Sequence, residues 1–280
     1  MKRFLSFLLV LGIVWGCGSG SNHNKNKDYV DSIKRERPLL HTDSARIISL
    51  PTPMQIPALL RNTNAHYTKE LLTPLMPIDK PFFQSNILFG MYILDLAYAS
   101  SFSDRQTALL YLKQCRDLSI DLGFGMNADM GLITRFERNL ERPDSLGRII
   151  LEMYKSGHEY FRYNEREAIG LMMVMGCMYE GMHFSFKEIR NTDLILFFHI
   201  LAQQKEYVSN LLYALDAYQI PDEVQPEFDI LVKTDSLFGK LNAPSAYKLK
   251  TGAATLKDVN TKSLNELDSL VTVFRQGMLE

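Results

Sequence analysis

Three side chains in an apolar segment are the first candidates for chemistry in this sequence. Asp95 is the only charged residue between positions 81 and 101, and Tyr92 and Tyr98 lie three positions to either side of it. On a helix this spacing places the three side chains on one broad flank. Burial of an unpaired carboxylate is costly, so Asp95 must be paired, hydrogen-bonded or protonated. It is either the acid of a binding pocket or a structural residue that tyrosine hydroxyl groups or a neighbouring helix end satisfy.

A second set of polar side chains lies in another apolar segment. Glu180 and His183 are three positions apart, so their side chains share one face of a helix. Either the carboxylate raises the pKa of the imidazole and makes an acid–base couple, or the pair supplies two metal ligands, with a third from Asp95 or His158. The remaining alternative is an internal polar clamp. We assign no catalytic residues, no metal and no cofactor from the sequence.

The two sets make one candidate pocket if the helices that carry them pack together. Two carboxylates that face each other across a core perturb each other's pKa, which is typical of functional sites. The spacing in the sequence does not establish that contact. The candidate pocket consists of Tyr92, Asp95, Tyr98, Glu180 and His183.

The elements that must position these residues are predicted to be helices. Residues 81–101 are apolar on nearly every face, which is typical of a helix buried inside a bundle, and the predicted helix at 165–190 is very apolar from 168 to 178. The next predicted helix reaches Leu122. Ser103 and Asp104 are typical cap residues at its start, and Gly123 is a typical residue just after its end. No window alternates between apolar and polar residues as a strand would. Further helices are predicted at 127–140, 143–163, 192–218 and 263–278. The predicted fold class is all-α, a multi-helix bundle of about 8–10 helices.

Sulfur-containing and small residues crowd the segment that carries Glu180. The sulfur side chains recur at helical spacing, which is the pattern of a core face filled by adaptable side chains. Gly170, Gly176 and Gly181 would let neighbouring helices approach closely. The stripe consists of Leu171, Met175, Met178 and Met182.

Two stretches of the chain are less regular. Prolines divide residues 50–80 into short helical pieces around 56–60 and 69–72. Residues 241–262 are rich in Ala, Thr, Asn, Pro, Ser and Gly, which predicts a long loop before the last helix. We place one all-helical domain at residues 45–280.

The composition excludes several classes of protein. The 280 residues include 31 Lys and Arg against 32 Asp and Glu, 46% hydrophobic residues and three cysteines. This balance fits neither a disordered polyelectrolyte nor a disulfide-rich scaffold. A net charge of −1 is unsuited to an electrostatic nucleic-acid binder, so we predict no nucleic-acid partner. Cys115 and Cys177 either form a disulfide in an oxidising compartment or remain two buried thiols.

The N-terminus has the most specific pattern in the chain. Two basic residues precede an apolar run at residues 4–15, which is about a dozen residues long where a membrane span needs about 20. A Gly-Cys pair follows, and this arrangement resembles the bacterial lipobox, in which the cysteine is lipidated after cleavage. Residues 1–16 are then a lipoprotein signal peptide, and residues 17–44 are the lipidated Cys17 and a flexible tether. Cleavage removes two basic residues and no acidic one, which changes the net charge from −1 to −3.

The residues after Cys17 indicate where the anchor lies. Gly18 is not the aspartate that retains enterobacterial lipoproteins in the inner membrane, so the resemblance favours the outer membrane. The acidic cluster that resembles a surface-export signal in Bacteroidota is absent next to Cys17, because the first acidic residue is Asp28. We therefore predict that the chain contacts the membrane through its N-terminal lipid and faces the periplasm.

Three short segments carry a family resemblance. PMQIPALL at 53–60, GMYILDLAYA at 90–99 and MYEGM at 178–182 resemble stretches in a group of all-helical Bacteroidota lipoproteins. The resemblance covers most of residues 50–235. That group has no assigned activity, so the resemblance implies a fold and a location and adds no chemistry.

A tripeptide pattern recurs more often than composition predicts. Asp-Ser followed by an aliphatic residue or Ala occurs five times and resembles the acceptor motif of periplasmic O-glycosylation in Bacteroidota. Helix capping is the alternative explanation, and it accounts for much of the pattern at Asp144 and Asp235. We predict glycosylation at Ser32 and Ser44, which lie before the helical core.

Three classes of function stay open from the sequence. The favoured one is an envelope lipoprotein whose helical body binds an envelope protein partner or has a structural role, without catalysis. The first alternative is a periplasmic small-ligand-binding protein, which needs a cavity where Asp95 and Glu180 converge. The second alternative is an enzyme that uses the same carboxylates, which needs perturbed pKa values beside open space.

Overall fold

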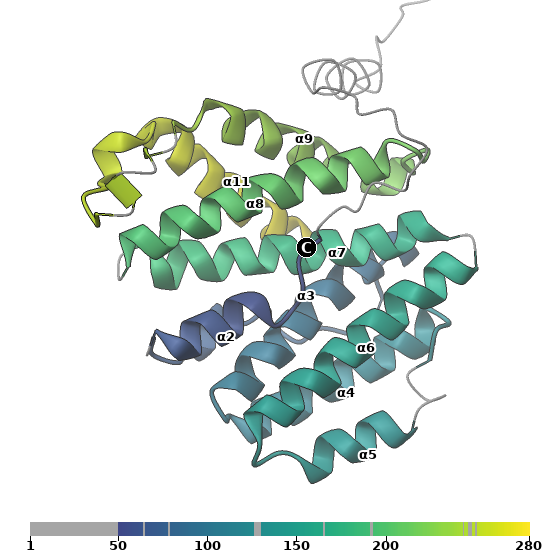
Figure 1. The fold of residues 1–280 in the computed structure, drawn as a ribbon. Helices are drawn as coiled ribbons and strands as arrows, with labels where there is room; N and C mark the ends of the chain where they lie inside the picture. Colours follow the sequence, from purple (N-terminus) through teal and green to yellow (C-terminus); the bar gives the residue numbers. More distant parts are fainter. Residues whose placement is uncertain are drawn as a thin grey trace, which may run out of the picture. The chain divides into compact units, whose positions relative to one another are not determined.

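The structure, a computed structural model, describes most of the chain from residue 50 onwards. The described residues are 50–280 except 64, 78, 126–129, 165, 191–192, 243, 246–247 and 250. The predicted signal peptide, Cys17, the tether and the glycosylation candidates Ser32 and Ser44 lie outside them. Within the described ranges the chain forms nine α-helices and no strand, so the predicted all-α class is confirmed (Figure 1).

The two most apolar segments of the sequence form the centre of the bundle. In α3 (Phe82–Ser101) every residue from Ser85 onwards is buried, and in α7 (Glu167–Phe184) every residue from Ile169 onwards is buried. Helices that are apolar all round must be covered by other helices. This explains why α3 and α7 lie inside the fold, as the sequence predicts.

Glycines let α3 and α7 touch backbone to backbone. A Cβ atom at Gly176 would lie 1.9 Å from the carbonyl oxygen of Ile87, and one at Gly90 would lie 1.9 Å from a carbonyl oxygen of α7. The predicted close approach at Gly176 is therefore confirmed. At Gly170 and Gly181 a Cβ atom would meet side-chain atoms at 3.3 and 3.4 Å, so the approach there is less close.

α3 and α7 run parallel. Ile87 in the first half of α3 meets Gly176 in the middle of α7, and further along both helices the rings of Tyr98 and Phe184 pack with centroids 4.5 Å apart. Residues that come later in α3 therefore lie beside residues that come later in α7. This register decides which polar side chains of the two helices meet.

The other helices cover this central pair on two sides. On one side α4 (Arg105–Asp121) and α6 (Pro143–Tyr163) pack on α3, and α5 (Met130–Arg138) packs on α6. On the other side α8 (Leu194–Leu215) and α11 (Thr261–Leu279) pack on α7, and α9 (Gln225–Lys240) lies against both of them. Figure 1 shows the α4–α6 group and the α8–α11 group on opposite sides of α7.

The predicted caps are present at the two ends of α4. Asp104 precedes the helix, and its carboxylate accepts a hydrogen bond from the Thr107 backbone N–H at 3.1 Å. Gly123 follows the helix with a φ of +81°, the left-handed conformation that glycine adopts without strain. Ser103 also has a positive φ, 63°, in the turn that connects α3 to α4. Pro143 occupies the first position of α6, where its missing N–H is not needed.

Helix boundaries in the C-terminal half differ from the sequence prediction. The predicted helices leave residues 219–240 unassigned, and α9 occupies most of that stretch after a 3-10 turn, Asp222–Val224. The predicted helix at 165–190 is α7 followed by a π-helical turn, Ser185–Ile189. The predicted loop at 241–262 ends two residues early, because α11 begins at Thr261.

The predicted capping roles of two aspartates are wrong. Asp235 lies in the middle of α9, where its carboxylate accepts a hydrogen bond from the Ser209 hydroxyl at 2.7 Å. Asp144 lies in the first turn of α6 and forms an ion pair with Arg61 at 2.9 Å. A carboxylate in the first turn is still favoured by the partial positive charge of the helix N-terminus.

The prolines divide the N-terminal part of the domain as predicted. α2 (Gln55–Asn62) and a 3-10 turn (Lys69–Leu71) are the helical elements described between residues 50 and 80. The remainder of this stretch has no regular structure, so its backbone groups need partners elsewhere. In the part of the chain that the structure describes, we find no helix with the length and apolarity that a membrane crossing requires.

Candidate functional site

The irregular segment at residues 65–77 lies against the predicted tyrosines of α3. The Tyr98 hydroxyl oxygen accepts a hydrogen bond from the Thr68 backbone N–H at 2.9 Å. The Tyr92 hydroxyl donates a hydrogen bond to the Pro74 carbonyl oxygen at 2.9 Å. Buried backbone groups must be paired, and apart from the 3-10 turn at Lys69–Leu71 this segment has no regular structure to pair them. The two tyrosines, each three positions from Asp95, therefore supply hydrogen bonds that the backbone of the segment does not make with itself.

Thr73 is the centre of the contact between this segment and the helices. Its backbone N–H donates to Asp95 Oδ2 at 3.1 Å, and its carbonyl oxygen accepts a hydrogen bond from the Tyr111 hydroxyl of α4. Its own hydroxyl oxygen accepts a third hydrogen bond from Arg275 Nη2 of α11 at 3.4 Å. Thr73 has no exposed surface, so water cannot reach its polar groups. Side chains from three helices make their hydrogen bonds instead.

Glu180 forms an ion pair with Arg275, a residue that was not predicted from the sequence to take part in the site. Arg275 Nε donates to Glu180 Oε2 at 2.7 Å, and Nη2 donates to Oε1 at 3.0 Å, which is the two-pronged geometry of a strong ion pair. The same Nη2 also donates to the Leu71 carbonyl oxygen at 2.9 Å. The guanidinium thus joins α7, α11 and the irregular segment at one point.

Asp95 and Glu180 lie together inside the core, and neither has any exposed surface. Burial and the negative charge of Glu180 raise the pKa of Asp95 well above its usual range. Burial raises the pKa of Glu180 as well, while the guanidinium of Arg275 lowers it again. The charge of Arg275 therefore favours ionisation of Glu180, while burial and the charge of Glu180 favour the protonated form of Asp95.

A protonated Asp95 has a hydrogen-bond acceptor nearby. Its Oδ2 is taken by Thr73, and its buried Oδ1 has no donor beside it. The Glu180 carboxyl group is close enough to Asp95 for each group to affect the pKa of the other. Two carboxylates cannot bond each other, but a protonated Asp95 donates to the Glu180 carboxylate. With one positive, one negative and one neutral group, the cluster of Asp95, Glu180 and Arg275 then carries no net charge.

His183 does not form the predicted acid–base couple with Glu180. Burial, as the largest cause, and the positive charges of Arg275 and Lys187 together lower the pKa of the imidazole to about 3. The alternative of a raised pKa therefore does not hold, and the Glu180 carboxylate is paired with Arg275 instead. His183 Nε2 is buried and has no hydrogen-bond partner. The ring is a neutral core residue at physiological pH.

The described cysteines are buried, and the described residues form no group of metal-binding side chains. Cys115 and Cys177 are free and buried, so the thiol alternative holds and the disulfide alternative does not. Burial raises the pKa of both thiols, which keeps them protonated and poorly nucleophilic. Over the described ranges, no three His, Cys, Asp or Glu side chains lie close enough together to hold a metal ion.

The structure brings the candidate pocket residues together as a structural cluster. Tyr92, Asp95 and Tyr98 bind the backbone of residues 65–77, and Glu180 lies beside Asp95. Arg275, Tyr111 and Thr73 also belong to the cluster and were not predicted from the sequence. One signal was available for Arg275, which follows the core residue Phe274 in α11 and so flanks the apolar stripe of that helix.

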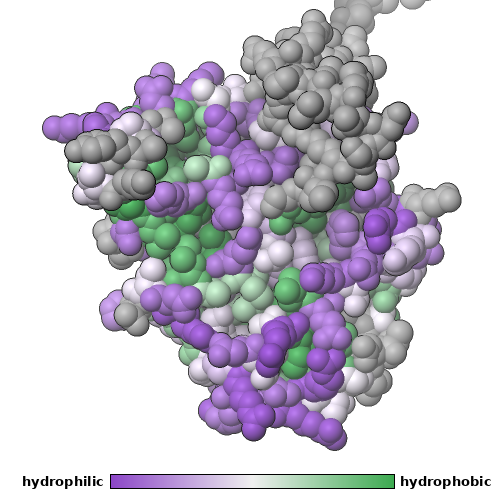
Figure 2. Space-filling model, viewed as in Figure 1, coloured by the Kyte–Doolittle hydropathy of each residue, from purple (hydrophilic) through white to green (hydrophobic). Residues whose placement is uncertain are grey.

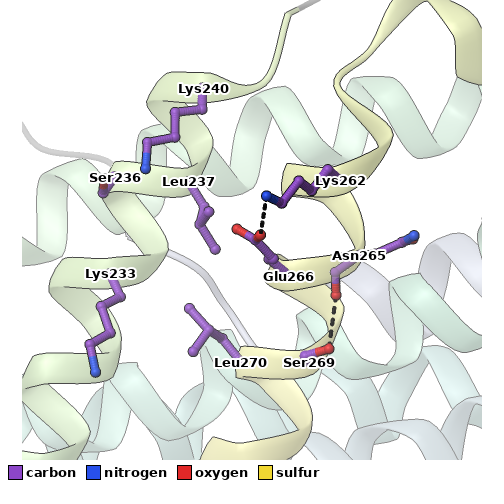
Figure 3. Close-up of a pocket in the computed structure, with 9 residues that line it drawn as sticks. All are labelled: Lys233, Ser236, Leu237, Lys240, Lys262, Asn265, Glu266, Ser269 and Leu270. Atoms are coloured by element: carbon purple, nitrogen blue, oxygen red, sulfur yellow. Dashed lines mark hydrogen bonds and ion pairs between the residues drawn. The ribbon is translucent and has the colours of Figure 1, made fainter.

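Two hollows on the surface lie apart from this cluster. The larger, about 730 Å³, is a groove between α9 and α11 (Figure 3), and the smaller, about 390 Å³, lies between α2 and the start of α6. No residue of the candidate pocket lines either hollow. Figure 2 also shows apolar side chains over the first half of α8, where Leu194, Ile195 and Leu196 are partly exposed.

Comparison with protein families, with curated proteins and with solved structures found no match for this chain. The function is therefore inferred from the residues of this chain and their contacts.

Proposed function

We propose that this protein is an outer-membrane lipoprotein whose helical body binds another envelope protein and does not catalyse a reaction. The observation that carries the proposal is the burial of Asp95 and Glu180, which have no exposed surface. A general acid or base must come within hydrogen-bonding reach of its substrate. These carboxyl groups contact Thr73 and Arg275 of the protein itself, so their chemistry is used to hold the fold together.

The two alternatives predict a different environment for these groups. A ligand-binding pocket needs open space where Asp95 and Glu180 converge, and an enzyme needs substrate access to a group with a perturbed pKa. The perturbed pKa of Asp95 is present, but Arg275, Thr73 and Glu180 fill the space around it. This arrangement supports the non-catalytic function over both alternatives.

The anchor is supported by the N-terminal sequence. Its basic start, short apolar run and Gly-Cys pair resemble a lipoprotein signal, and Cys17 is the residue that would carry the lipid. A lipid-anchored protein stays close to the membrane and meets other envelope proteins at a high local concentration. A binding function therefore benefits directly from the anchor.

Lipid attachment is tested with the full chain expressed in cells of a Bacteroidota species. We expect an alkyne-labelled fatty acid to be incorporated and the protein to fractionate with the outer membrane. The Cys17→Ser chain is the control, and it should lose the label and keep its unprocessed length. A labelled Cys17→Ser chain, or a wild-type chain released into the soluble periplasm, would contradict the anchor.

Partner binding is tested by cross-linking in intact cells at native expression, followed by identification of the cross-linked species. We expect one or a few envelope proteins to be captured by the wild-type chain in stoichiometric amounts. The Cys17→Ser chain should capture much less, because it is no longer held at the membrane. A wild-type chain that is correctly anchored and captures nothing would contradict the binding function.

A further inference from the structure

The groove between α9 and α11 has an apolar floor. The two helices run in opposite directions, and Figure 3 shows Leu237 of α9 and Leu270 of α11 pointing toward each other between them. One turn beyond Leu270 on the same face of α11, Val273 is 51% exposed. The apolar strip therefore continues past the end of the groove along α11. A strip of this kind on a helix pair is suited to the apolar face of a third helix.

The rim of the groove carries positive charge without matching acids. Lys233 and Lys240 of α9 are exposed, and neither forms an ion pair with the residues that the structure describes. On the opposite rim Lys262 is 4.0 Å from Glu266, a loose contact between two exposed side chains. The groove thus has a surplus of two positive charges beside an apolar floor.

Two copies of the Asp-Ser-Leu tripeptide fix the walls of the groove. In α9 the Asp235 carboxylate accepts a hydrogen bond from Ser209 of α8 at 2.7 Å, and in α11 Asp268 forms ion pairs with Lys187 and Arg190 at 3.4 and 3.6 Å. Each aspartate ties its helix to the body behind it. The serine and leucine that follow it line the groove in both helices, which makes the groove a preformed surface.

We propose that this groove binds an amphipathic α-helix of a partner protein, with acidic residues flanking its apolar face. Lys233 and Lys240 are seven residues apart, which is about 10 Å along α9. Acidic residues at positions i and i+7 of the bound helix match that spacing, and apolar residues at i+3 and i+4 enter the groove over Leu237 and Leu270. This inference rests on the proposed binding function and names the surface and the chemistry of the partner.

The test uses the lipidated full-length protein in detergent and a fluorescent synthetic helix as probe. The probe has about 18 residues, glutamates at i and i+7 and leucines at i+3 and i+4, and binding is followed by fluorescence anisotropy. One control probe has lysines in place of the glutamates, and a second has the same composition in scrambled order. We expect the acidic probe to bind at least about tenfold more tightly than either control, and more weakly as salt is added.

Charge reversal in the groove supplies the matched protein variants. Lys233→Glu with Lys240→Glu should weaken binding of the acidic probe by about tenfold and strengthen binding of the lysine probe. The control pair, Lys155→Glu with Lys205→Glu, changes exposed lysines of α6 and α8 outside the groove and should leave both affinities within about twofold. Equal affinity for the acidic and basic probes, or equal loss in both variant pairs, overturns the proposal. Displacement of the acidic probe by dodecanoate at similar concentration would also overturn it, because the groove would then be a site for small amphiphiles.

Cross-linking in cells separates this inference from the function on which it rests. Loss of the captured envelope protein in the Lys233→Glu and Lys240→Glu chain, with capture by the control pair intact, supports both. Capture that persists in the groove variant refutes the groove and leaves the binding function standing. Absence of capture by wild type, together with charge-dependent probe binding, refutes the binding function and leaves the chemistry of the groove standing.

Discussion

The inner and outer faces of α11 use charge in opposite ways. On the inner face Arg275 meets Glu180, Leu71 and Thr73, and its hydrogen bonds go to groups of the protein itself. On the outer face Lys262 has one loose contact, and Lys233 and Lys240 across the groove form no ion pair with the part of the chain that the structure describes. The residue types are similar, but one set is desolvated and paired while the other is solvated and available. On α11, charge therefore holds the fold together on the inner face and is solvated on the outer face.

This contrast changes which residues are the better candidates for a role in binding. The sequence directs interest to Asp95 and Glu180, because acids in apolar segments are rare. Their burial and their bonds to Thr73 and Arg275 make them structural. The lysines of the groove are ordinary residues in the sequence, and only the packing of α9 beside α11 gives them a shared role.

Removal of the buried arginine should have the largest effect. Arg275→Met leaves Glu180 as an unpaired buried carboxylate, and we expect the free energy of unfolding to fall by about 3–5 kcal/mol in urea denaturation at pH 7. Lys262→Met, on the outer face of the same helix, should change it by less than about 0.5 kcal/mol. Replacing Glu180 and Arg275 together by Met should recover most of the loss. Equal effects at positions 275 and 262 would remove the distinction between the two faces.

Closing the contact between α3 and α7 should have the next largest effect. In Gly176→Ala the new Cβ atom would lie 1.9 Å from the Ile87 carbonyl oxygen, so the two helices must move apart. We expect a loss of about 3 kcal/mol in the free energy of unfolding. Gly277→Ala is the matched control, because a Cβ atom there meets nothing within 4 Å, and it should stabilise α11 by up to about 1 kcal/mol. A Gly176→Ala chain as stable as wild type would mean that the helices do not touch at this point.

The buried proton predicts a dependence of stability on pH. The pKa of Asp95 is raised in the folded protein, so folded Asp95 keeps a proton that the unfolded chain releases above about pH 4. Its contribution to stability is complete below that pH and is lost as the pH rises toward the folded pKa, by about 1.4 kcal/mol per pH unit. Asp95→Asn keeps a neutral donor toward Glu180, so stability relative to wild type should improve steadily with pH. The contribution of His183 is the same in both chains and cancels in this difference. A difference that is constant from pH 4 to 8 would show that Asp95 is ionised.

The outer face should tolerate change with almost no effect on folding. Lys233→Glu with Lys240→Glu alters two exposed side chains that make no ion pair with the residues described. We expect the midpoint of thermal unfolding to stay within about 2 °C of wild type. A large loss of stability would mean that the groove is part of the core and would weaken its role in recognition.

Local patterns predicted the fold well. The strongly apolar stretches at residues 81–101 and 168–178 identified the two central helices, and Asp104 and Gly123 marked the ends of α4 correctly. α9 was missed although Pro226 stands in its first turn, a position that proline favours. Propensity and periodicity act over a few residues, which is why such patterns identify helices reliably and their contacts poorly.

The candidate site was only partly predicted, because its contacts join residues that lie far apart in the sequence. Asp95, Tyr92 and Tyr98 stood out as polar residues in an apolar helix, but the groups they bind lie in the irregular segment at residues 65–77. Arg275 pairs with Glu180 across 95 positions, and no spacing rule connects residues so far apart. The groove is harder still, since it exists only as the space between two helices whose packing the sequence does not state.

The position of Arg275 also affects how long the folded protein lasts. Its bond to Leu71 joins residues that are 204 positions apart, whereas most contacts in helical proteins are local and form quickly. Closing so long a loop is entropically unfavourable until α3 and α7 have packed, so the bond should form late in folding. Interactions that are absent from the transition state slow unfolding and barely alter the refolding rate. We therefore expect Arg275→Met to shorten the lifetime of the folded state in stopped-flow unfolding while refolding proceeds at nearly the wild-type rate, so that one late contact determines how long the protein resists opening.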